Sequence, residues 1–139
     1  MSQENVELHY RTLDAVNRRD LGALLGLMDD GVEAVPLIAA MEGGYHGHDG
    51  IRRWWMNLLD AFPDFAIEVV EVRDVGDVTV MAVRIRGHGA DSDTPVEQMI
   101  WHAVRWGRER CIWWGSFDTL AEALETLGLS EQEAKAEPS

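Results

Sequence analysis

Apolar residues recur at helical spacing in several parts of the chain. One stripe with steps of three and four predicts a helix over residues 2–19, with these members: Val6, Tyr10, Leu13 and Val16. The clearest pattern predicts a helix over 51–62, whose apolar positions fit the template without a miss: Ile51, Trp54, Trp55, Leu58, Leu59 and Phe62. Shorter helices are expected after Asp20 and from position 118 or 119 to Leu127, where Gly128 ends the run.

The segments between these helices are rich in Val and Ile and predict strands over 32–38, 65–73, 78–86, 96–106 and 110–117. If Arg108 and Glu109 form a two-residue hairpin loop, Gly107 lies opposite Arg110. This register places Met99, Trp101, Trp114 and Asp118 on one face, and His102, Val104 and Trp113 on the other. Both faces are then apolar, so we expect helices to cover one and a second subunit to cover the other. The order of elements predicts an α+β fold with a strongly bent antiparallel sheet.

The composition and charge of the chain argue against several classes of function. With 139 residues the chain has the length of one domain, which we place at 1–130, followed by an acidic, frayed tail at 131–139. The formal charge of −13 argues against nucleic acid as a partner, because a polyanion repels phosphates. Cys111 is the single cysteine, and no stretch approaches the ~20 apolar residues of a membrane span. The polar N-terminus lacks the pattern of a secretory signal, so we expect a cytoplasmic protein.

Several short motifs occur together in one known family. They are Asn17-Arg-Arg-Asp-Leu21, Tyr45-His-Gly47, Gly50-Ile-Arg52, Phe62-Pro-Asp-Phe65, Glu68-Val-Val-Glu-Val72 and the closing Glu122-Ala-Leu-Glu-Thr-Leu-Gly-Leu129. By the order and spacing of these motifs, the chain resembles the SnoaL-like branch of the nuclear transport factor two-like superfamily. The resemblance implies a cone-shaped sheet wrapped around three or four helices, a deep apolar pocket at its open end, and pairing of two copies through the outer sheet face. The superfamily includes cyclases, isomerases, epoxide hydrolases and binders without chemistry, so the fold leaves the function open.

Two catalytic patterns of the superfamily are missing from this chain. The ketosteroid isomerase pattern places Ala34 at the position of its aspartate base, and Thr12 and Trp101 at those of its two oxyanion donors. Glu33 is adjacent but turned to the other face of its strand. The Asp-Arg-Asp trio of epoxide hydrolases does not assemble either, since the strand around 97–105 carries only Glu97 and Arg105 as charges.

A third pattern is present. SnoaL-type cyclases carry a Trp and an Asp four residues apart near the end of the last strand, which matches Trp114 and Asp118. On this resemblance Asp118 is the candidate general acid/base, with its pKa raised by apolar neighbours. The other interpretation is that Asp118 only caps the last helix.

The remaining candidates define a site without metal or cofactor. We expect a pocket for a small hydrophobic or aromatic molecule, lined by Tyr10, His46, Trp54, Trp55, Met99, Trp101 and Trp114. His102, Val104 and Trp113 are expected at the homodimer interface. His46, His48 and Asp49 lie too close together in a turn to form a metal site by themselves. Two functions stay open: a cofactor-free cyclase or isomerase using Asp118, and a non-catalytic homodimer that binds a ligand or a partner.

Overall fold

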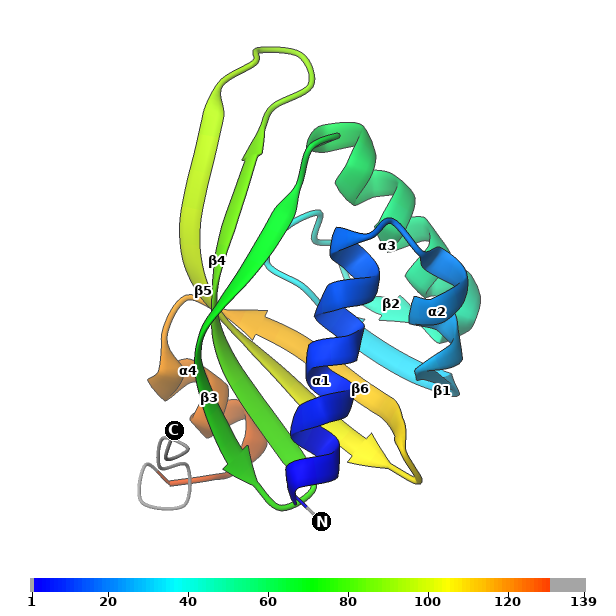
Figure 1. Cartoon of the computed structure of the whole chain (residues 1–139), viewed down its shortest axis with the longest axis vertical. Helices are drawn as coiled ribbons and strands as arrows, with labels where there is room; N and C mark the ends of the chain where they lie inside the picture. The colour runs from blue at the N-terminus through cyan, green and yellow to red at the C-terminus, as the bar shows by residue number, and fades with distance from the viewer. Residues whose placement is uncertain (1, 131–139) are drawn as a thin grey trace.

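A curved, mostly antiparallel sheet wraps around three helices and carries a fourth on its outside (Figure 1). The computed structural model describes residues 2–130, within which four helices and six strands are found. The predicted acidic tail at 131–139 lies outside the described residues. The expected α+β class and the bent sheet are therefore confirmed. No helix in the described part of the chain is long and apolar enough to cross a membrane.

The four predicted helices are all present. They are α1 (Ser2–Asn17), α2 (Leu21–Gly26), α3 (Gly47–Ala61) and α4 (Leu120–Leu127). Helix α3 begins four residues before the apolar pattern does, and Asp49 forms an ion pair with Arg52 at 2.8 Å instead of capping the helix. Helix α4 has the predicted ends. The Thr119 hydroxyl accepts the backbone N–H of Glu122, and Gly128 ends the helix at φ 72°.

The strands are β1 (Met28–Val35), β2 (Tyr45–His46), β3 (Ala66–Val75), β4 (Val78–His88), β5 (Pro95–Gly107) and β6 (Arg110–Phe117). They pair in the order β2-β1-β6-β5-β4-β3, and β1 runs parallel to β6. The first strand starts four residues earlier than the apolar run at 32–38 predicts. Alternation within it is as expected, because Ala34 is fully buried while Glu33 is exposed.

The predicted register between β5 and β6 is correct at the turn and wrong beyond it. Gly107 lies opposite Arg110, and Arg108 and Glu109 both have positive φ, as a tight hairpin loop requires. A β-bulge at Ile112 then shifts the pairing by one, so that Trp101 faces Phe117 where Ser116 had been expected. Since side chains alternate, this single residue exchanges the two faces of β5 relative to β6.

The two faces of the sheet carry separate apolar clusters. The inner cluster lies between the concave face and α1, α2 and α3, and it contains most of the buried core, Trp54, Trp55, Trp106 and Trp114 included. The outer cluster includes Val80, Ala103, Trp101, Trp113 and Phe117, and α4 packs on it through Leu120 and Leu127. The chain therefore covers with its own last helix part of the face for which we expected a second subunit.

Candidate functional site

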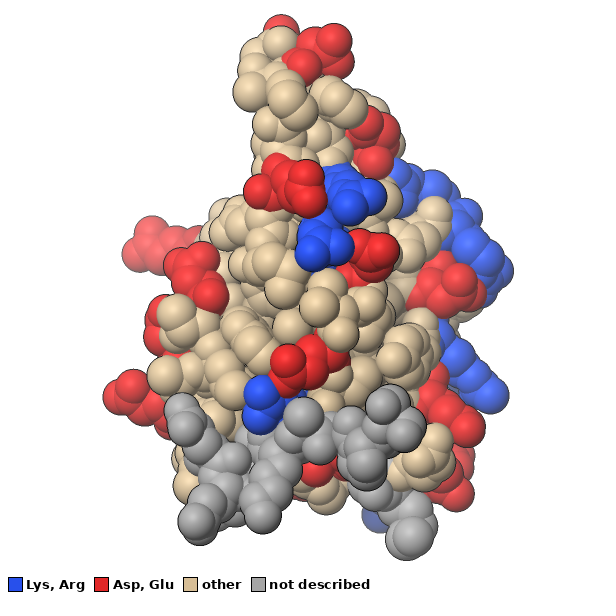
Figure 2. Space-filling view, turned by 60° about the vertical axis from the view of Figure 1, so that its left-hand side comes forward, with Lys and Arg blue, Asp and Glu red and all other residues tan. Residues whose placement is uncertain are grey.

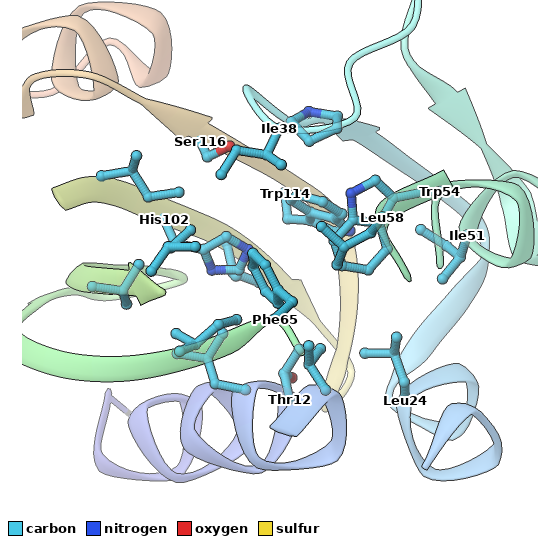
Figure 3. A pocket seen from close by; sticks show the side chains of 18 of the residues that line it. Thr12, Leu24, Ile38, Ile51, Trp54, Leu58, Phe65, His102, Trp114 and Ser116 are labelled. Atoms are coloured by element: carbon cyan, nitrogen blue, oxygen red, sulfur yellow. The ribbon is translucent and has the colours of Figure 1, made fainter. Parts of the chain in front are cut away.

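A cavity opens between the concave face of the sheet and helices α1 and α3 (Figure 3). The space free of atoms inside it, with the open mouth included, has a volume of about 620 Å³. A sphere the size of a water molecule can place its centre within about 40 Å³ of that space. The helices contribute Leu13, Val16, Leu24, Ile51, Trp54 and Leu58. The sheet contributes chiefly Val83, Ile85, Ile100, His102, Val104 and Trp114. Among the described residues that line the cavity there is no Asp, Glu, Lys or Arg.

The structure brings together only part of the expected pocket. Trp54 and Trp114 line the cavity and contact each other edge to face, with ring centroids 4.9 Å apart. Trp55 is buried in the core beside the cavity without lining it, and His46 is an exposed residue at the start of α3. Tyr10 is 45% exposed, because the buried stripe of α1 passes through His9 instead.

The β-bulge explains the other differences. Met99 and Trp101 lie on the outer face, where Trp101 joins the cluster under α4. His102 and Val104, which the predicted register had placed outside, line the cavity. Trp113 lies on the outer face as expected, next to Phe117 at a centroid distance of 6.3 Å.

Asp118 lies outside the cavity. Its side chain is exposed, and its carboxylate accepts a long hydrogen bond of 3.4 Å from the amide of Gln98. The helix cap is Thr119, so Asp118 does not have the capping role of the alternative interpretation either. The expectation that apolar neighbours surround this carboxylate is wrong, because the bulge leaves Met99 and Trp101 on the outer face of the sheet, away from Asp118.

A pair of histidines lies at the cavity wall, with His102 lining the cavity and His9 bonded behind it. His102 from β5 points among the lining side chains in Figure 3, and its Nδ1 lies 2.8 Å from Nε2 of His9 on α1. His9 is fully buried, and its Nδ1 lies 2.7 Å from the hydroxyl of Thr79 on β4. The same hydroxyl accepts the indole N–H of Trp106 at 2.8 Å. Four side chains from three elements thus form one continuous hydrogen-bonded row that ends at the cavity.

Burial keeps both histidines neutral. Desolvation, and then the neighbouring His102, lower the pKa of His9 well below its ordinary value. Desolvation lowers the pKa of His102 to about 4. Both imidazoles are therefore uncharged at neutral pH, and each carries one proton on one of its two ring nitrogens.

Three further polar groups lie at the cavity wall. Trp54 is buried and its indole N–H has no hydrogen-bond partner within the described part of the chain. Ser116 accepts the backbone N–H of Leu37 at 2.7 Å, which leaves its own hydroxyl hydrogen available. Thr12 donates to the carbonyl of Leu8 at 2.9 Å. The wall is thus apolar with a small number of placed polar groups, which is how small-molecule sites are commonly built.

The residues considered for a metal are directed to separate partners. His46 contacts the carbonyl of Gly43, and His48 contacts the carbonyl of Met28. Asp49 pairs with Arg52. Within residues 2–130 no group of three or more His, Cys, Asp or Glu is arranged to hold a metal ion. The free thiol of Cys111 is fully buried, and burial raises its pKa, so it is not a reactive group at neutral pH.

His9 is the functional candidate that the sequence analysis missed. It lies three residues after Val6 and four before Leu13, so helical spacing alone puts it on the buried stripe of α1. A buried histidine needs partners for both ring nitrogens, and this requirement indicates a polar network. The partners themselves, Thr79 and His102, lie 70 and 93 positions away and are brought to His9 only by the curved sheet.

Comparison with known proteins agrees with this fold. The family model of the SnoaL-like domain matches residues 9–111. No curated protein matches the chain by sequence. A putative SnoaL-like polyketide cyclase from Jannaschia sp. is similar in structure, with 19% identity and a TM-score of 0.74 over 90% of this chain and 91% of that one.

Two further solved structures are similar at low identity. A hypothetical protein with a ketosteroid isomerase-like fold from Catenulispora acidiphila, in complex with trimethylamine, is 17% identical with a TM-score of 0.73 over 91% and 95% of the two chains. TerC, co-crystallised with polyporic acid, is 17% identical with a TM-score of 0.72 over 90% and 98%. At such identities the structures establish the fold alone, whereas the family model covers most of the sequence. The chain therefore belongs to the SnoaL-like domain family, with the fold of nuclear transport factor two-like proteins.

Proposed function

We propose that this protein binds a small, largely hydrophobic organic molecule in the cavity between α1, α3 and the concave face of the sheet. The observation that carries the proposal is the lining itself, which is apolar and uncharged apart from a few polar groups, among them His102, Trp54 and Ser116. A charged ligand would lose its hydration there without gaining a counter-charge. A compact neutral molecule loses little and gains the burial of its apolar surface.

The size of the cavity fits this class of ligand. The atom-free space of about 620 Å³ includes the open mouth, so the enclosed part of the cavity is smaller than this. The smaller volume open to a water-sized sphere favours a compact molecule over an extended chain. Structures of similar fold support only the binding of a small organic molecule, and not its lack of charge, since one of them was crystallised with the amine trimethylamine and another with polyporic acid.

Cofactor-free catalysis is the second candidate function, and one observation favours it. His102 is a titratable side chain that lines the cavity, and a second histidine holds its orientation through a 2.8 Å hydrogen bond. Cyclisation or isomerisation next to a carbonyl needs a placed proton donor or acceptor at the ligand. Asp118 does not meet this need, because its carboxylate is exposed outside the cavity.

The test is a titration with 1-indanone, a compact neutral ketone, followed by tryptophan fluorescence. Because Trp54 and Trp114 line the cavity, a bound aromatic molecule is expected to change their emission in a saturable manner. Binding should weaken by at least tenfold in Val104→Trp, which fills the cavity. The matched control is Met99→Trp on the outer face, which should bind as the wild type does.

Two results would contradict the proposal. One is an absence of saturable binding, and the other is equal affinity in Val104→Trp and wild type. Circular dichroism of the variants separates lost binding from lost folding. For the catalytic candidate, any turnover found with a ketone substrate should disappear in His102→Gln and persist in Asp118→Asn. The reverse outcome would return the catalytic role to Asp118.

A further inference from the structure

The row of hydrogen bonds behind His102 has a direction. At its buried end, the indole N–H of Trp106 can only donate, so the oxygen of Thr79 must accept at this contact. The Thr79 side chain is fully buried, and its hydroxyl still has one hydrogen to donate. The remaining partner of this oxygen within the described residues is Nδ1 of His9, at 2.7 Å. All groups are satisfied when Thr79 donates its hydrogen to His9.

The opposite direction would leave a buried donor without a partner. If Nδ1 of His9 carried the proton, Thr79 would accept two hydrogen bonds, and its own hydrogen would have no acceptor among the described residues. An unsatisfied buried hydroxyl costs about 1–3 kcal/mol, which is enough to decide between two neutral tautomers. The geometry therefore places the proton of His9 on Nε2.

The same reasoning extends to the cavity. Nε2 of His9 lies 2.8 Å from Nδ1 of His102, so His9 donates and His102 accepts. A neutral His102 with a bare Nδ1 carries its proton on Nε2. This nitrogen has no protein partner within residues 2–130, and His102 lines the cavity. The row runs from Trp106 through Thr79 and His9 to an unpaired N–H of His102.

We propose that the row Trp106–Thr79–His9 fixes His102 as a hydrogen-bond donor to the cavity, and that the ligand is therefore a molecule that offers a carbonyl oxygen as the acceptor. The indole N–H of Trp54, a lining residue on α3, has no partner within the described residues and is a second donor for such a ligand. Two unpaired donors on an uncharged wall favour a carbonyl oxygen over a group that itself donates. This inference rests on the proposed function, since it names the ligand class of the same cavity.

His9 is a positioning residue in this arrangement, because it acts on the ligand only through His102. Substitution by glutamine tests that role without removing the polarity of the row. In His9→Gln the introduced amide oxygen can accept from Thr79 while the amide N–H₂ donates to His102. Substitution by phenylalanine instead leaves Nδ1 of His102 without a donor, so the proton of His102 is free to move to that nitrogen.

The first experiment reads the tautomers directly. Long-range ¹H–¹⁵N correlation spectra of the uniformly labelled protein at pH 7 distinguish a proton on Nδ1 from one on Nε2. His9→Gln and His102→Gln serve to assign the two buried rings among the five histidines. We expect both rings to be neutral with the proton on Nε2. A proton on Nδ1 of His102 in the wild type would overturn the inference, whatever the protein binds.

The second experiment compares 1-indanone with indane, which has the same two rings and no carbonyl. The quantity of interest is the ratio of the two Kd values. In wild type this ratio should favour the ketone, and in His102→Phe the preference should fall by about two- to tenfold, the net effect of one hydrogen bond. The preference should fall similarly in His9→Phe and be retained in His9→Gln. Trp54→Phe should also lower the preference for the ketone, independently of the change at His102.

The outcomes separate this inference from the proposed function. If both compounds bind and the preference is unchanged in His102→Phe, the donor role is wrong while the binding cavity stands. If neither compound binds to folded wild-type protein, the proposed function fails and the ligand class fails with it. Retained binding of indane by each variant shows that its cavity is intact, so a change in the ratio reports the hydrogen bond alone.

Discussion

At the scale of single residues, His102 links the stability of the protein to pH. The unfolded chain takes up a proton at this residue near pH 6.5, whereas folded His102 does so only near pH 4. Below pH 6.5 the unfolded state therefore binds more protons, and acid destabilises the fold. We expect wild type to lose about 2 kcal/mol more unfolding free energy than His102→Gln between pH 7 and pH 4.5. Urea denaturation at the two pH values measures this, and equal losses would show that His102 is not desolvated.

The exposed pair of His88 and Asp64 has the opposite pH dependence. Its side chains lie 2.6 Å apart, and Asp64 also accepts the backbone N–H of His88 at 2.7 Å. The hydrogen bond to Asp64 raises the pKa of His88 above 6.5, and the hydrogen bond from His88 lowers the pKa of Asp64 below 3.8. The contribution of His88 is complete below pH 6.5 and is lost as the pH rises through its raised pKa. That of Asp64 is complete above pH 3.8 and is lost as the pH falls through its lowered pKa.

This pair is therefore most stabilising between these two pH values. An NMR titration of the imidazole C–H signals should give His88 a midpoint above 6.5, and Asp64→Asn should return the midpoint toward 6.5. An unchanged His88 midpoint in Asp64→Asn would contradict the ion pair.

At the scale of elements, sequence periodicity predicted the helices better than it predicted the sheet. The stripe of α3 has one strong period, so Ile51, Trp54 and Leu58 could be placed on its buried side. Strands β5 and β6 are apolar on both faces, so alternation alone does not say which face is inside. Cys111 and Trp114 both point inward and are three residues apart, which requires an irregularity between them. That bulge turned Trp101 out of the expected site and brought His102 into it.

The segment before β2 offers an element-scale prediction. Residues 36–44 supply Pro36 and Ile38 to the cavity wall and end at two glycines with positive φ. An added Cβ at Gly44 would lie 2.7 Å from the carbonyl oxygen of Ala34, whereas at Gly43 it would meet open space. Both alanine variants carry a left-handed penalty of about 1 kcal/mol, and Gly44→Ala adds a backbone clash. Gly44→Ala should therefore melt clearly below Gly43→Ala, and equal melting temperatures would contradict this packing.

At the scale of the whole molecule, the outer face of the sheet combines ion pairs with apolar surface. Arg84 lies between Glu68 and Glu97, at 2.7 and 3.4 Å, and Figure 2 shows acidic and basic side chains next to each other among uncharged ones. These exposed pairs contribute little to stability, about 0–1 kcal/mol each. They neutralise these arginines, so the net charge of −13 comes from acidic residues outside these pairs.

The homodimer through the outer sheet face stays a prediction, and native mass spectrometry tests it together with ligand retention. Helix α4 covers part of this face, but Met99 on β5 is still 43% exposed there. We expect a wild-type dimer that Met99→Glu converts to monomers, because a carboxylate buried in the contact loses its hydration. Met56→Glu is the matched control, since Met56 is 62% exposed on α3, away from the sheet. A wild-type monomer would contradict this prediction and would mean that α4 alone covers the apolar part of the outer sheet face. Extra mass that disappears on denaturation would identify a retained molecule, whose oxygen content then tests the donor role of His102 directly.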